Sequence, residues 1–224
     1  MEEYEISFDE LQITDFDVIK EIGYSSYNQD SFIIHQIGII LSNLSSEIKP
    51  KFVYKIFCGN VDLECSQVRL KYTDLEVGKM ISFIMKDSTA FAVFAATAGN
   101  EFDVFLKKSR EKHEIFEEYL LDAVGSCIVE KTGEYMENLL QRKIGKLMHT
   151  QRFSPGYCGW PLSEQEKIFQ LLGRKPCGID LSSYFLMTPI KSISGIIGIG
   201  ENVNKVKYGC SICNMKSCYK RKTK

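Results

Sequence analysis

The sequence predicts an α+β fold: a single domain with a twisted, mainly antiparallel sheet, a long helix and several shorter helices. Apolar residues recur at three- and four-residue steps from Asp30 to Ser45, and again from Glu114 to about Met148, which is typical of helices that bury one side. β-branched and aromatic runs at 52–57 and 91–97 are typical of strands. These elements do not alternate as β-α-β units, and no linker separates them, so one domain is the simplest organisation.

The first half of the chain supplies the main helices and two strands. The helix at 30–45 is expected to pack one side on the sheet. The run at 91–97 is apolar throughout, so we expect it to be buried on both faces. The long helix carries acids early and bases late, the order that complements a helix dipole. Its predicted apolar stripe consists of Ile115, Tyr119, Ala123, Cys127, Val129, Met136, Leu140, Ile144 and Leu147.

The second half begins with a loop rich in turn-forming residues, from Arg152 to Pro161. Ser163-x-x-Glu166 then predicts a capping box, and Gly173 predicts the end of that helix. Strands are expected at 184–187 and 193–199. Glycines at 195, 198 and 200 indicate close backbone approach along the second of these strands.

Composition excludes several classes of function. The 224 residues include 28 Lys and Arg against 29 Asp and Glu, and this balance gives no general case for nucleic acid or an anionic membrane as partner. The most apolar helical stretch, 32–41, is far shorter than the ~20 residues that span a bilayer. The N-terminus is acidic and has no pattern of a signal peptide, so a cytoplasmic location is expected.

Charge and cysteine are unevenly distributed along the chain. Residues 1–17 hold seven acids and no base, whereas 205–224 hold seven bases and no acid. We therefore predict a folded domain at 1–204 and a basic tail at 205–224. The two charged ends either simply solvate the chain or form docking surfaces.

Three of the eight cysteines cluster in the tail, as Cys210-x-x-Cys213-x-x-x-x-Cys218. Thiolates at this spacing suit zinc or an iron–sulfur cluster, with Cys158 or Cys177 as a fourth ligand. Reactive thiols flanked by lysines are equally compatible with the spacing.

The loop at 152–161 carries the most informative chemistry. It offers the Arg152 guanidinium, which can grip a carboxylate, a Pro-Gly turn, and aromatic faces at Tyr157 and Trp160. Such groups suit a zwitterion that carries an additional cation, because aromatic faces attract sulfonium and ammonium groups. The alternative is a purely structural turn with Trp160 in the core.

An ordered set of motifs resembles the reactivation (activation) domain of cobalamin-dependent methionine synthase over about residues 10–200. The set consists of Ala-Ala-Thr-Ala-Gly at 95–99, Leu-Asp-Ala-Val-Gly-Ser at 121–126 with Val129-Glu130, Arg-x-x-Pro-Gly-Tyr at 152–157, Trp-Pro-Leu at 160–162, and Leu-x5-Met-x-Pro-x2-Ser-x-Ser-Gly at 181–195. One departure is Ser182-Ser183-Tyr184, where the family usually has Thr-Glu-Ser, so an acid is missing there.

The resemblance implies that the loop binds S-adenosylmethionine. Arg152 would hold the methionine carboxylate, Ser154 and Gly156 on either side of Pro155 would present backbone groups, and Tyr157 would lie near the sulfonium or the adenosine. Glu130 would compensate the positive charge. Further cofactor contacts would come from Trp160, Tyr184 and Met187.

The implied function is reductive methylation of cob(II)alamin carried by a partner, a cobalamin-binding methionine synthase subunit, with a flavodoxin-like or other electron donor. A chain of 224 residues lacks room for the homocysteine, folate and cobalamin modules, so the protein would act as part of the methyltransferase rather than alone. Two alternatives stay open: a non-catalytic S-adenosylmethionine or corrinoid-protein binding module, and a redox activator of another corrinoid methyltransferase.

Overall fold

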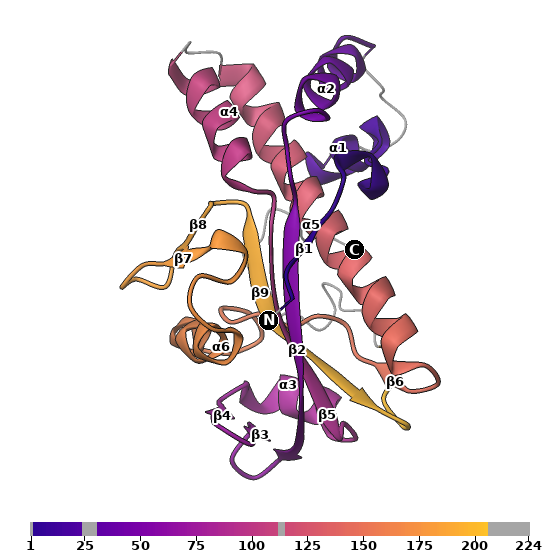
Figure 1. The fold of residues 1–224 in the computed structure, drawn as a ribbon, viewed down its shortest axis with the longest axis vertical. Coiled ribbons are helices and arrows are strands. Elements are labelled where there is room, and N and C mark those ends of the chain that lie inside the picture. The colour runs from indigo at the N-terminus through magenta and orange to yellow at the C-terminus, as the bar shows by residue number, and fades with distance from the viewer. Residues whose placement is uncertain (1, 24–30, 112–114, 206–224) are drawn as a thin grey trace.

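A computed structural model describes residues 2–23, 31–111 and 115–205, and its spine is one antiparallel sheet (Figure 1). The strands run in the order β4 (Asp74–Leu75), β3 (Gln67–Leu70), β2 (Lys51–Asp62), β5 (Ala90–Thr97), β9 (Ser192–Gly200) and β6 (Met148–His149). The short β1 (Tyr4–Glu5) pairs with the beginning of β2, and β3 pairs with its end. Every strand pair in the described ranges is antiparallel, so the predicted α+β class is confirmed.

Strand β5 lies at the centre of the sheet and separates two hydrophobic clusters. Ala92, Phe94 and Ala96 belong to one cluster, whereas Phe91 and Val93 belong to the other, as the alternation of side chains along a strand requires. The first cluster includes residues of α1 (Asp15–Glu21), α2 (Ser31–Leu44), α4 (Asn100–Glu111) and α5 (Ile115–Ile144). The second includes residues of α3 (Gly78–Met85) and α6 (Gln165–Leu172). The prediction that 91–97 is buried on both faces is confirmed.

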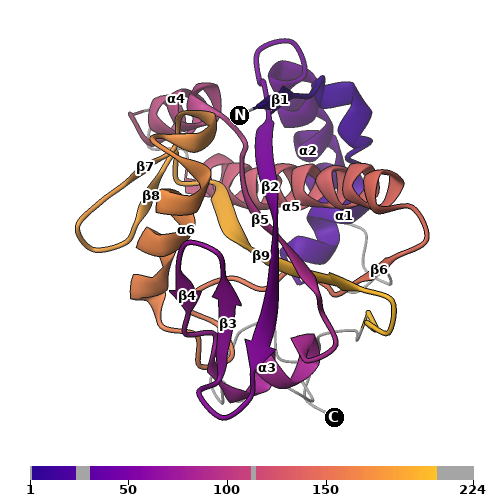
Figure 2. The ribbon, with the colours of Figure 1, turned by 60° about the horizontal axis from the view of Figure 1, so that its bottom comes forward.

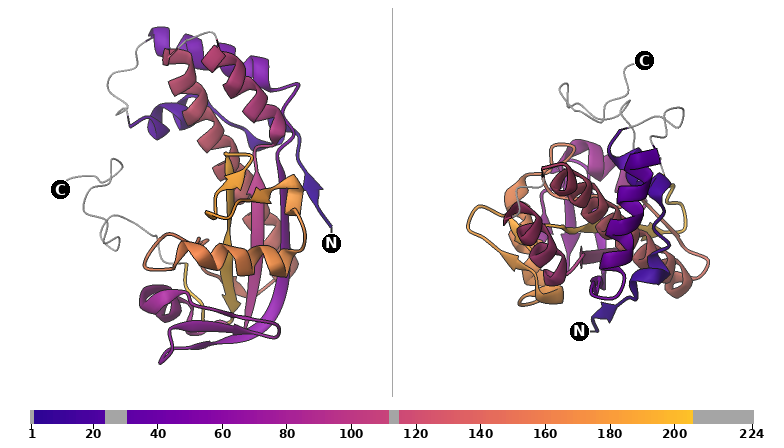
Figure 3. Two further views of the ribbon diagram at one scale, coloured as in Figure 1. Left: turned by 90° about the vertical axis from the view of Figure 1, so that its left-hand side faces the viewer. Right: turned by 90° about the horizontal axis from the view of Figure 1, so that it is seen from above.

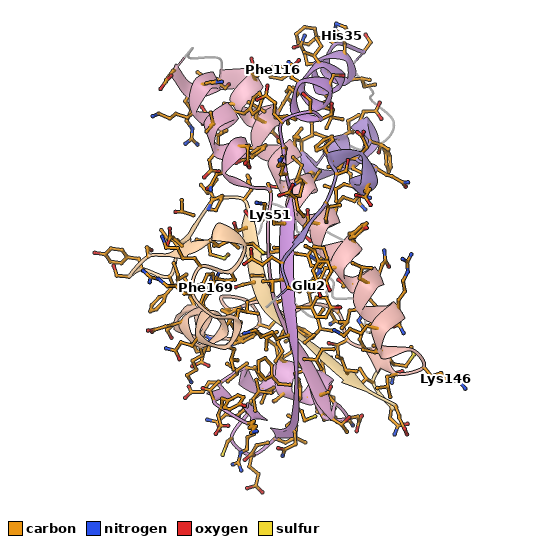
Figure 4. The ribbon with its side chains drawn as sticks, viewed as in Figure 1. Glu2, His35, Lys51, Phe116, Lys146 and Phe169 are labelled. Carbon is orange, nitrogen blue, oxygen red and sulfur yellow. The ribbon has the colours of Figure 1, made fainter. Side chains whose placement is uncertain are left out.

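The two ends of the sheet carry different elements (Figure 3). Helices α2 and α4 form a helical lobe at one end, whereas α3, β3 and β4 lie at the other (Figures 1 and 2). Helix α5 crosses behind the sheet from Phe116, near His35, towards Lys146 (Figure 4). Helix α6 and the hairpin of β7 (Asp180–Leu181) and β8 (Met187–Thr188) lie on one flank (Figure 1). Short 3-10 turns complete the fold at Phe8–Leu11, Leu162–Glu164 and Pro176–Gly178.

Two helices pack differently from what the sequence predicts. Helix α2 has nearly the predicted bounds, but its main neighbours are α1 and α5 rather than the sheet. The predicted stripe of the long helix fails at Ile115 and Tyr119, which are exposed, because the first turns of α5 reach past the end of the sheet (Figure 3). From Ala123 to Leu140 the stripe is buried as predicted.

The predicted capping box at Ser163 is wrong. A 3-10 turn at Leu162–Glu164 leads directly into α6, so Glu164 occupies the cap position and Ser163 makes no capping bond. The Glu164 carboxylate, which is buried, instead accepts a hydrogen bond of 2.9 Å from the backbone N–H of Glu76. A contact from a distant segment therefore decides how this helix begins. Gly173 does end the helix, with φ of 106°.

The strand predicted at 184–187 is also wrong for most of its length. Only Met187 is in a strand, and it pairs with Leu181 in the β7–β8 hairpin. Tyr184 and Phe185 lie in the turn, where Phe185 has φ of 61° and its N–H donates to the Ser182 carbonyl. The predicted strand at 193–199 is confirmed as β9.

The acidic N-terminal segment is largely engaged within the domain. Glu5 pairs with Lys49 and Lys51, and the hydrogen bond to Lys51 helps to hold the pKa of the Glu5 carboxyl below its usual value. Asp17 pairs with Lys131 of α5 at 3.3 Å. Partial burial alone would raise the pKa of Asp17, but hydrogen bonds from Thr14 and the Lys131 ammonium outweigh it and the pKa is lowered. These acids therefore fasten the N-terminus to the fold.

Across the part of the chain that the structure describes, no helix combines the length and apolar character needed to cross a membrane.

Candidate functional site

The segment before the Pro-Gly turn runs beside β9 and thereby fixes Arg152. The Thr150 N–H donates to the Gly198 carbonyl at 2.9 Å, and Phe153 exchanges two backbone hydrogen bonds with Ile196, at 3.0 and 2.9 Å. Gly195 permits this approach, since a Cβ there would lie 2.0 Å from the Phe153 carbonyl oxygen. The glycines of β9 thus serve the close backbone approach that the sequence predicts.

The Arg152 side chain lies across one face of α5. Its Nη2 is 2.9 Å from Glu130 Oε2, and its Nε is 2.6 Å from Glu137 Oε1. Gly133 lies between the two acids on that face, and a Cβ on Gly133 would come within 1.8 Å of Arg152 Nη1. The guanidinium therefore occupies space that any other residue at position 133 would fill.

Glu137 joins Arg152 to the far end of the described chain. Its second oxygen, Oε2, is 2.6 Å from Lys205 Nζ, and the Glu137 side chain is only 10% exposed. Glu130, by contrast, is 57% exposed. The four side chains carry two negative and two positive charges, so the cluster as a whole is neutral.

The loop after Arg152 is held by its own backbone. The Gly156 N–H donates to the Trp160 carbonyl at 2.8 Å, and the Trp160 N–H donates to the Tyr157 carbonyl at 2.9 Å. Gly156 and Gly159 have φ of 90° and 83°, a region that favours glycine. The Gly156 N–H is thus used inside the loop, and the backbone donor expected there is not available to a ligand in this arrangement.

A pocket of about 750 Å³ opens between α5, β9 and this loop. Its charged wall is the Glu130, Glu137, Arg152 and Lys205 cluster. Its lining also includes Gln151, Phe153, Ser154, Tyr157, Cys158 and Ile193. Neither polar atom of the Gln151 amide has a hydrogen-bond partner, although both are buried. We call this the Arg152 pocket.

A second pocket of about 490 Å³ adjoins the first. Ser154, Tyr157 and Ile193 line both pockets, so the Pro-Gly loop forms a shared wall. The second pocket continues towards α4, α6 and the β7–β8 hairpin, and we call it the hairpin pocket. Tyr157, 58% exposed, stands at the rim between the two.

Most residues predicted for the site are brought together. Glu130, Arg152, Ser154 and Tyr157 line the Arg152 pocket, and Pro155 and Met187 line the hairpin pocket. Gly156, Trp160 and Tyr184 line neither. Trp160 is 1% exposed and belongs to the core on the α6 side of the sheet, and Tyr184 is 80% exposed in the hairpin turn. The structure thus favours the interpretation of Trp160 as a core residue rather than a ligand contact.

Four residues of the site were missed from the sequence: Gly133, Glu137, Gln151 and Lys205. A signal for two of them was present, because Glu130, Gly133 and Glu137 follow each other at helical spacing of three and four residues. Nothing local identifies Gln151 or Lys205, which reach the pocket only through the tertiary fold.

The predicted metal ligands Cys210, Cys213 and Cys218 lie outside the described residues. Among the residues that are described, no group of three or more His, Cys, Asp or Glu side chains could hold a metal ion. Burial raises the pKa of the Cys177 thiol to about 12. Because metal ligands are thiolates, this environment disfavours Cys177 as a fourth ligand where it now lies.

Fold and site together define a class: an α+β domain with a charge-balanced pocket between a long helix and the sheet. Residues 76–220 match the family model described as vitamin B12-dependent methionine synthase, activation domain, and the chain belongs to this family. The matched range continues past residue 204 and includes the three clustered cysteines.

A solved structure supports the fold. The crystal structure titled as the MetH reactivation domain bound to AdoHcy is similar with a TM-score of 0.70 and 17% sequence identity, covering 92% of this chain and 80% of that one. No curated protein matches the chain in a sequence search.

Proposed function

We propose that this protein binds S-adenosylmethionine in the Arg152 pocket and serves as the reactivation subunit of a cobalamin-dependent methionine synthase. The observation that carries the proposal is the neutral cluster of Arg152, Glu130, Glu137 and Lys205, in a chain that belongs to the activation-domain family. The similar reactivation domain was crystallised with AdoHcy, which is S-adenosylmethionine without its methyl group.

The groups of the pocket fit the amino-acid end of this ligand. A guanidinium binds a carboxylate through two parallel hydrogen bonds, and Glu130 can take the α-ammonium group. Tyr157 offers an aromatic face to the sulfonium, an attraction worth about 0.5–2 kcal/mol depending on desolvation. The unpartnered Gln151 amide adds a donor and an acceptor that a polar ligand can satisfy. A pocket of about 750 Å³ also has the usual size for a ligand of this kind.

The exposure of the two acids suggests how the ligand enters. Glu130 is more than half exposed and can leave Arg152 at small cost, because exposed ion pairs contribute about 0–1 kcal/mol. Glu137 is nearly buried and stays, so it keeps the Arg152 side chain oriented. The ligand carboxylate then replaces Glu130, and Glu130 turns to the ligand ammonium.

The protein contributes to the reaction by positioning the ligand and by excluding water. Cobalamin, carried by the partner subunit, supplies the methyl-accepting chemistry, and a flavodoxin-like or other donor supplies the electron. Arg152 and Glu130 anchor the amino-acid end, which leaves the sulfonium methyl at the Tyr157 rim, where a partner can approach. Such anchoring lowers the barrier by removing the freedom of the reacting groups. No side-chain nucleophile is needed.

The tail at 205–224 is included in this proposal as a basic extension whose cysteines hold an iron–sulfur cluster or zinc. Lys205, its first residue, reaches the Arg152 pocket, so the tail starts beside the ligand.

Calorimetric titration with S-adenosylmethionine tests the binding step. We expect the wild type to bind, and Arg152→Ala to lower the affinity by more than about tenfold, since a charge-assisted pair to the carboxylate is lost. Arg110→Ala is the matched control, because Arg110 also pairs with a glutamate, Glu118, but lies outside both pockets. Absence of binding by the wild type, or equal affinity in Arg152→Ala, contradicts the proposal.

A further inference from the structure

Helices α2 and α4 both pack on α5 in the helical lobe (Figure 1). A pocket of about 350 Å³ opens between these three helices, and we call it the lobe pocket. None of the residues that line it lines the Arg152 pocket or the hairpin pocket. The lobe pocket is therefore a separate cavity, and the proposed function does not use it.

The most buried side chains of the lobe pocket are mainly apolar. Ile40 and Leu44 lie four residues apart on α2 and are 5% and 0% exposed. Leu121 of α5 is 3% exposed, and Phe105 of α4 adds an aromatic ring. Together these four residues form an apolar floor, on which a ligand can bury an aliphatic chain of a few carbon atoms.

One buried residue of the pocket is polar and has no partner. Ser109 of α4 is 3% exposed, and its Oγ makes no hydrogen bond. A buried hydroxyl within a helix commonly donates to a carbonyl one turn earlier. Ser82, Ser126 and Thr132 do so here, at 3.0, 3.1 and 2.7 Å. Because native folds satisfy the large majority of buried polar groups, the Ser109 hydroxyl indicates that a polar ligand atom enters this pocket.

Charged side chains of both signs line the more exposed part of the pocket. Lys108 of α4 is exposed, and its Nζ lies 5.7 Å from the centre of the Phe105 ring. Glu111 is the last residue of the same helix, and Glu117 lies in the first turn of α5. The last carbonyl groups of a helix favour a cation, so the side of the pocket near Glu111 suits an ammonium group.

We infer that the lobe pocket binds a free α-amino acid with an apolar side chain of about the size of methionine or leucine. The carboxylate of the ligand accepts hydrogen bonds from Lys108 and Ser109, whereas its ammonium group lies against Glu111 and Glu117. The apolar side chain of the ligand covers the apolar floor. This inference goes beyond the proposed function and does not depend on it.

The mixed charge of the lining decides between classes of small ligand. A phosphate or a dicarboxylate would bring additional negative charge to Glu111 and Glu117, and a simple amine would leave Lys108 without an anion. A zwitterion supplies one partner for each sign. A volume of about 350 Å³ lies at the small end of the usual range for ligand pockets, which suits an amino acid better than a nucleotide.

Calorimetric titration of the full chain with L-methionine tests this inference. We expect saturable binding that is about fivefold weaker in Ser109→Ala and about tenfold weaker in Lys108→Gln, because each variant loses a hydrogen bond to the ligand carboxylate. Lys107→Gln is the matched control, because Lys107 is the exposed neighbour of Lys108 on α4 and lines none of the three pockets.

Two analogues of the ligand check that both of its charges are recognised. 4-(Methylthio)butanoate lacks the ammonium group of methionine, and L-methioninol lacks the carboxylate. We expect the wild type to bind each of them at least about tenfold more weakly than L-methionine.

Arg152→Ala separates the lobe pocket from the Arg152 pocket, whose proposed ligand also has an amino-acid end. We expect this variant to bind L-methionine as the wild type does. Absence of saturable binding, an unchanged affinity in Ser109→Ala or Lys108→Gln, equal binding of either analogue, or loss of binding in Arg152→Ala overturns the inference. The proposed function is tested by binding of S-adenosylmethionine, so the two can fail separately.

Discussion

Arg152 owes its position to a residue that has no side chain. The guanidinium lies against Gly133, between Glu130 and Glu137, and a Cβ at position 133 would overlap Arg152 Nη1. Glycine in the middle of a helix normally costs about 1 kcal/mol relative to alanine. This cost is offset by the space that lets Arg152 reach both acids.

Gly133→Ala tests this account of the site. The new methyl group meets only the far end of the Arg152 side chain and the tip of Ile193, so we expect the arginine to shift while the fold persists. We expect the affinity for S-adenosylmethionine to fall by about tenfold or more, while the free energy of unfolding changes by less than about 1 kcal/mol, because better helix propensity compensates. Calorimetry and urea unfolding measure the two quantities.

Gly38→Ala provides the matched control for that variant. Gly38 also lies within a helix, α2, but it is exposed and a Cβ there has no neighbour within 4 Å. It should gain up to about 1 kcal/mol of stability and bind S-adenosylmethionine as the wild type does. An unchanged affinity in Gly133→Ala would show that Arg152 does not need this position.

Among single residues, those of the candidate site that belong to a local motif were predictable from the sequence. Arg152, Ser154 and Tyr157 lie within one short loop, and Glu130 is part of a recognisable helix segment. Glu137 and Lys205 were not predicted as site residues because they are 68 residues apart and meet only when α5 lies beside the end of β9. Trp160 lies in the core, and the sequence left both positions open because a loop aromatic can face either a ligand or the core.

At the scale of elements, two helices with similar start signals begin differently. Thr14-x-x-Asp17 forms a capping box at α1, where the Asp17 N–H donates to Thr14 Oγ1 at 3.2 Å and the Thr14 N–H donates to Asp17 Oδ2 at 2.9 Å. Ser163-x-x-Glu166 has the same pattern but makes no such bonds. The difference arises because Glu164 is drawn into the contact with Glu76, which extends the helix start by a 3-10 turn.

The stability of two alanine variants should reflect this difference. Thr14→Ala removes an observed cap and should cost about 1 kcal/mol of unfolding free energy. Ser163→Ala removes an exposed hydroxyl that caps nothing and should stay within about 0.5 kcal/mol of the wild type. Urea unfolding of both variants measures the effect, and a loss for Ser163→Ala as large as that for Thr14→Ala would contradict the assignment.

The strands also show that local sequence patterns predict only the longer elements. β5 is a largely apolar run of eight residues, and β9, with nine, is rich in isoleucine and glycine, so their existence was predictable. β3, β4 and β6 have only four, two and two residues, which is too short for a periodic signal. Their pairing is decided by the neighbouring strands and not by their own sequences.

At the scale of the whole molecule, the near-zero net charge conceals two ends with different roles. Two of the seven N-terminal acids, Glu5 and Asp17, pair with Lys49, Lys51 and Lys131, and these pairs fasten the chain to the sheet and to α5. The basic end instead starts at the Arg152 pocket, through the pair between Lys205 and Glu137. Of the two ends, the basic one is therefore the better candidate for a docking surface.

The pocket arrangement also suggests why such a domain needs a partner. In the proposed function, Arg152 and Glu130 anchor the amino-acid end of the ligand, which places the reacting methyl at the Tyr157 rim. Under this proposal, the cobalamin-carrying partner approaches this rim to receive the methyl group.

The most direct test of the central claim is a reactivation assay. This protein, a methionine synthase partner loaded with cob(II)alamin, a reductant and S-adenosylmethionine are mixed, and the loss of the cob(II)alamin absorption spectrum is followed. We expect methylcobalamin to form with the wild type and with Arg110→Ala, and at least about tenfold more slowly with Arg152→Ala. Binding of S-adenosylmethionine without turnover, reduction without methyl transfer, or an equal rate in Arg152→Ala would contradict it.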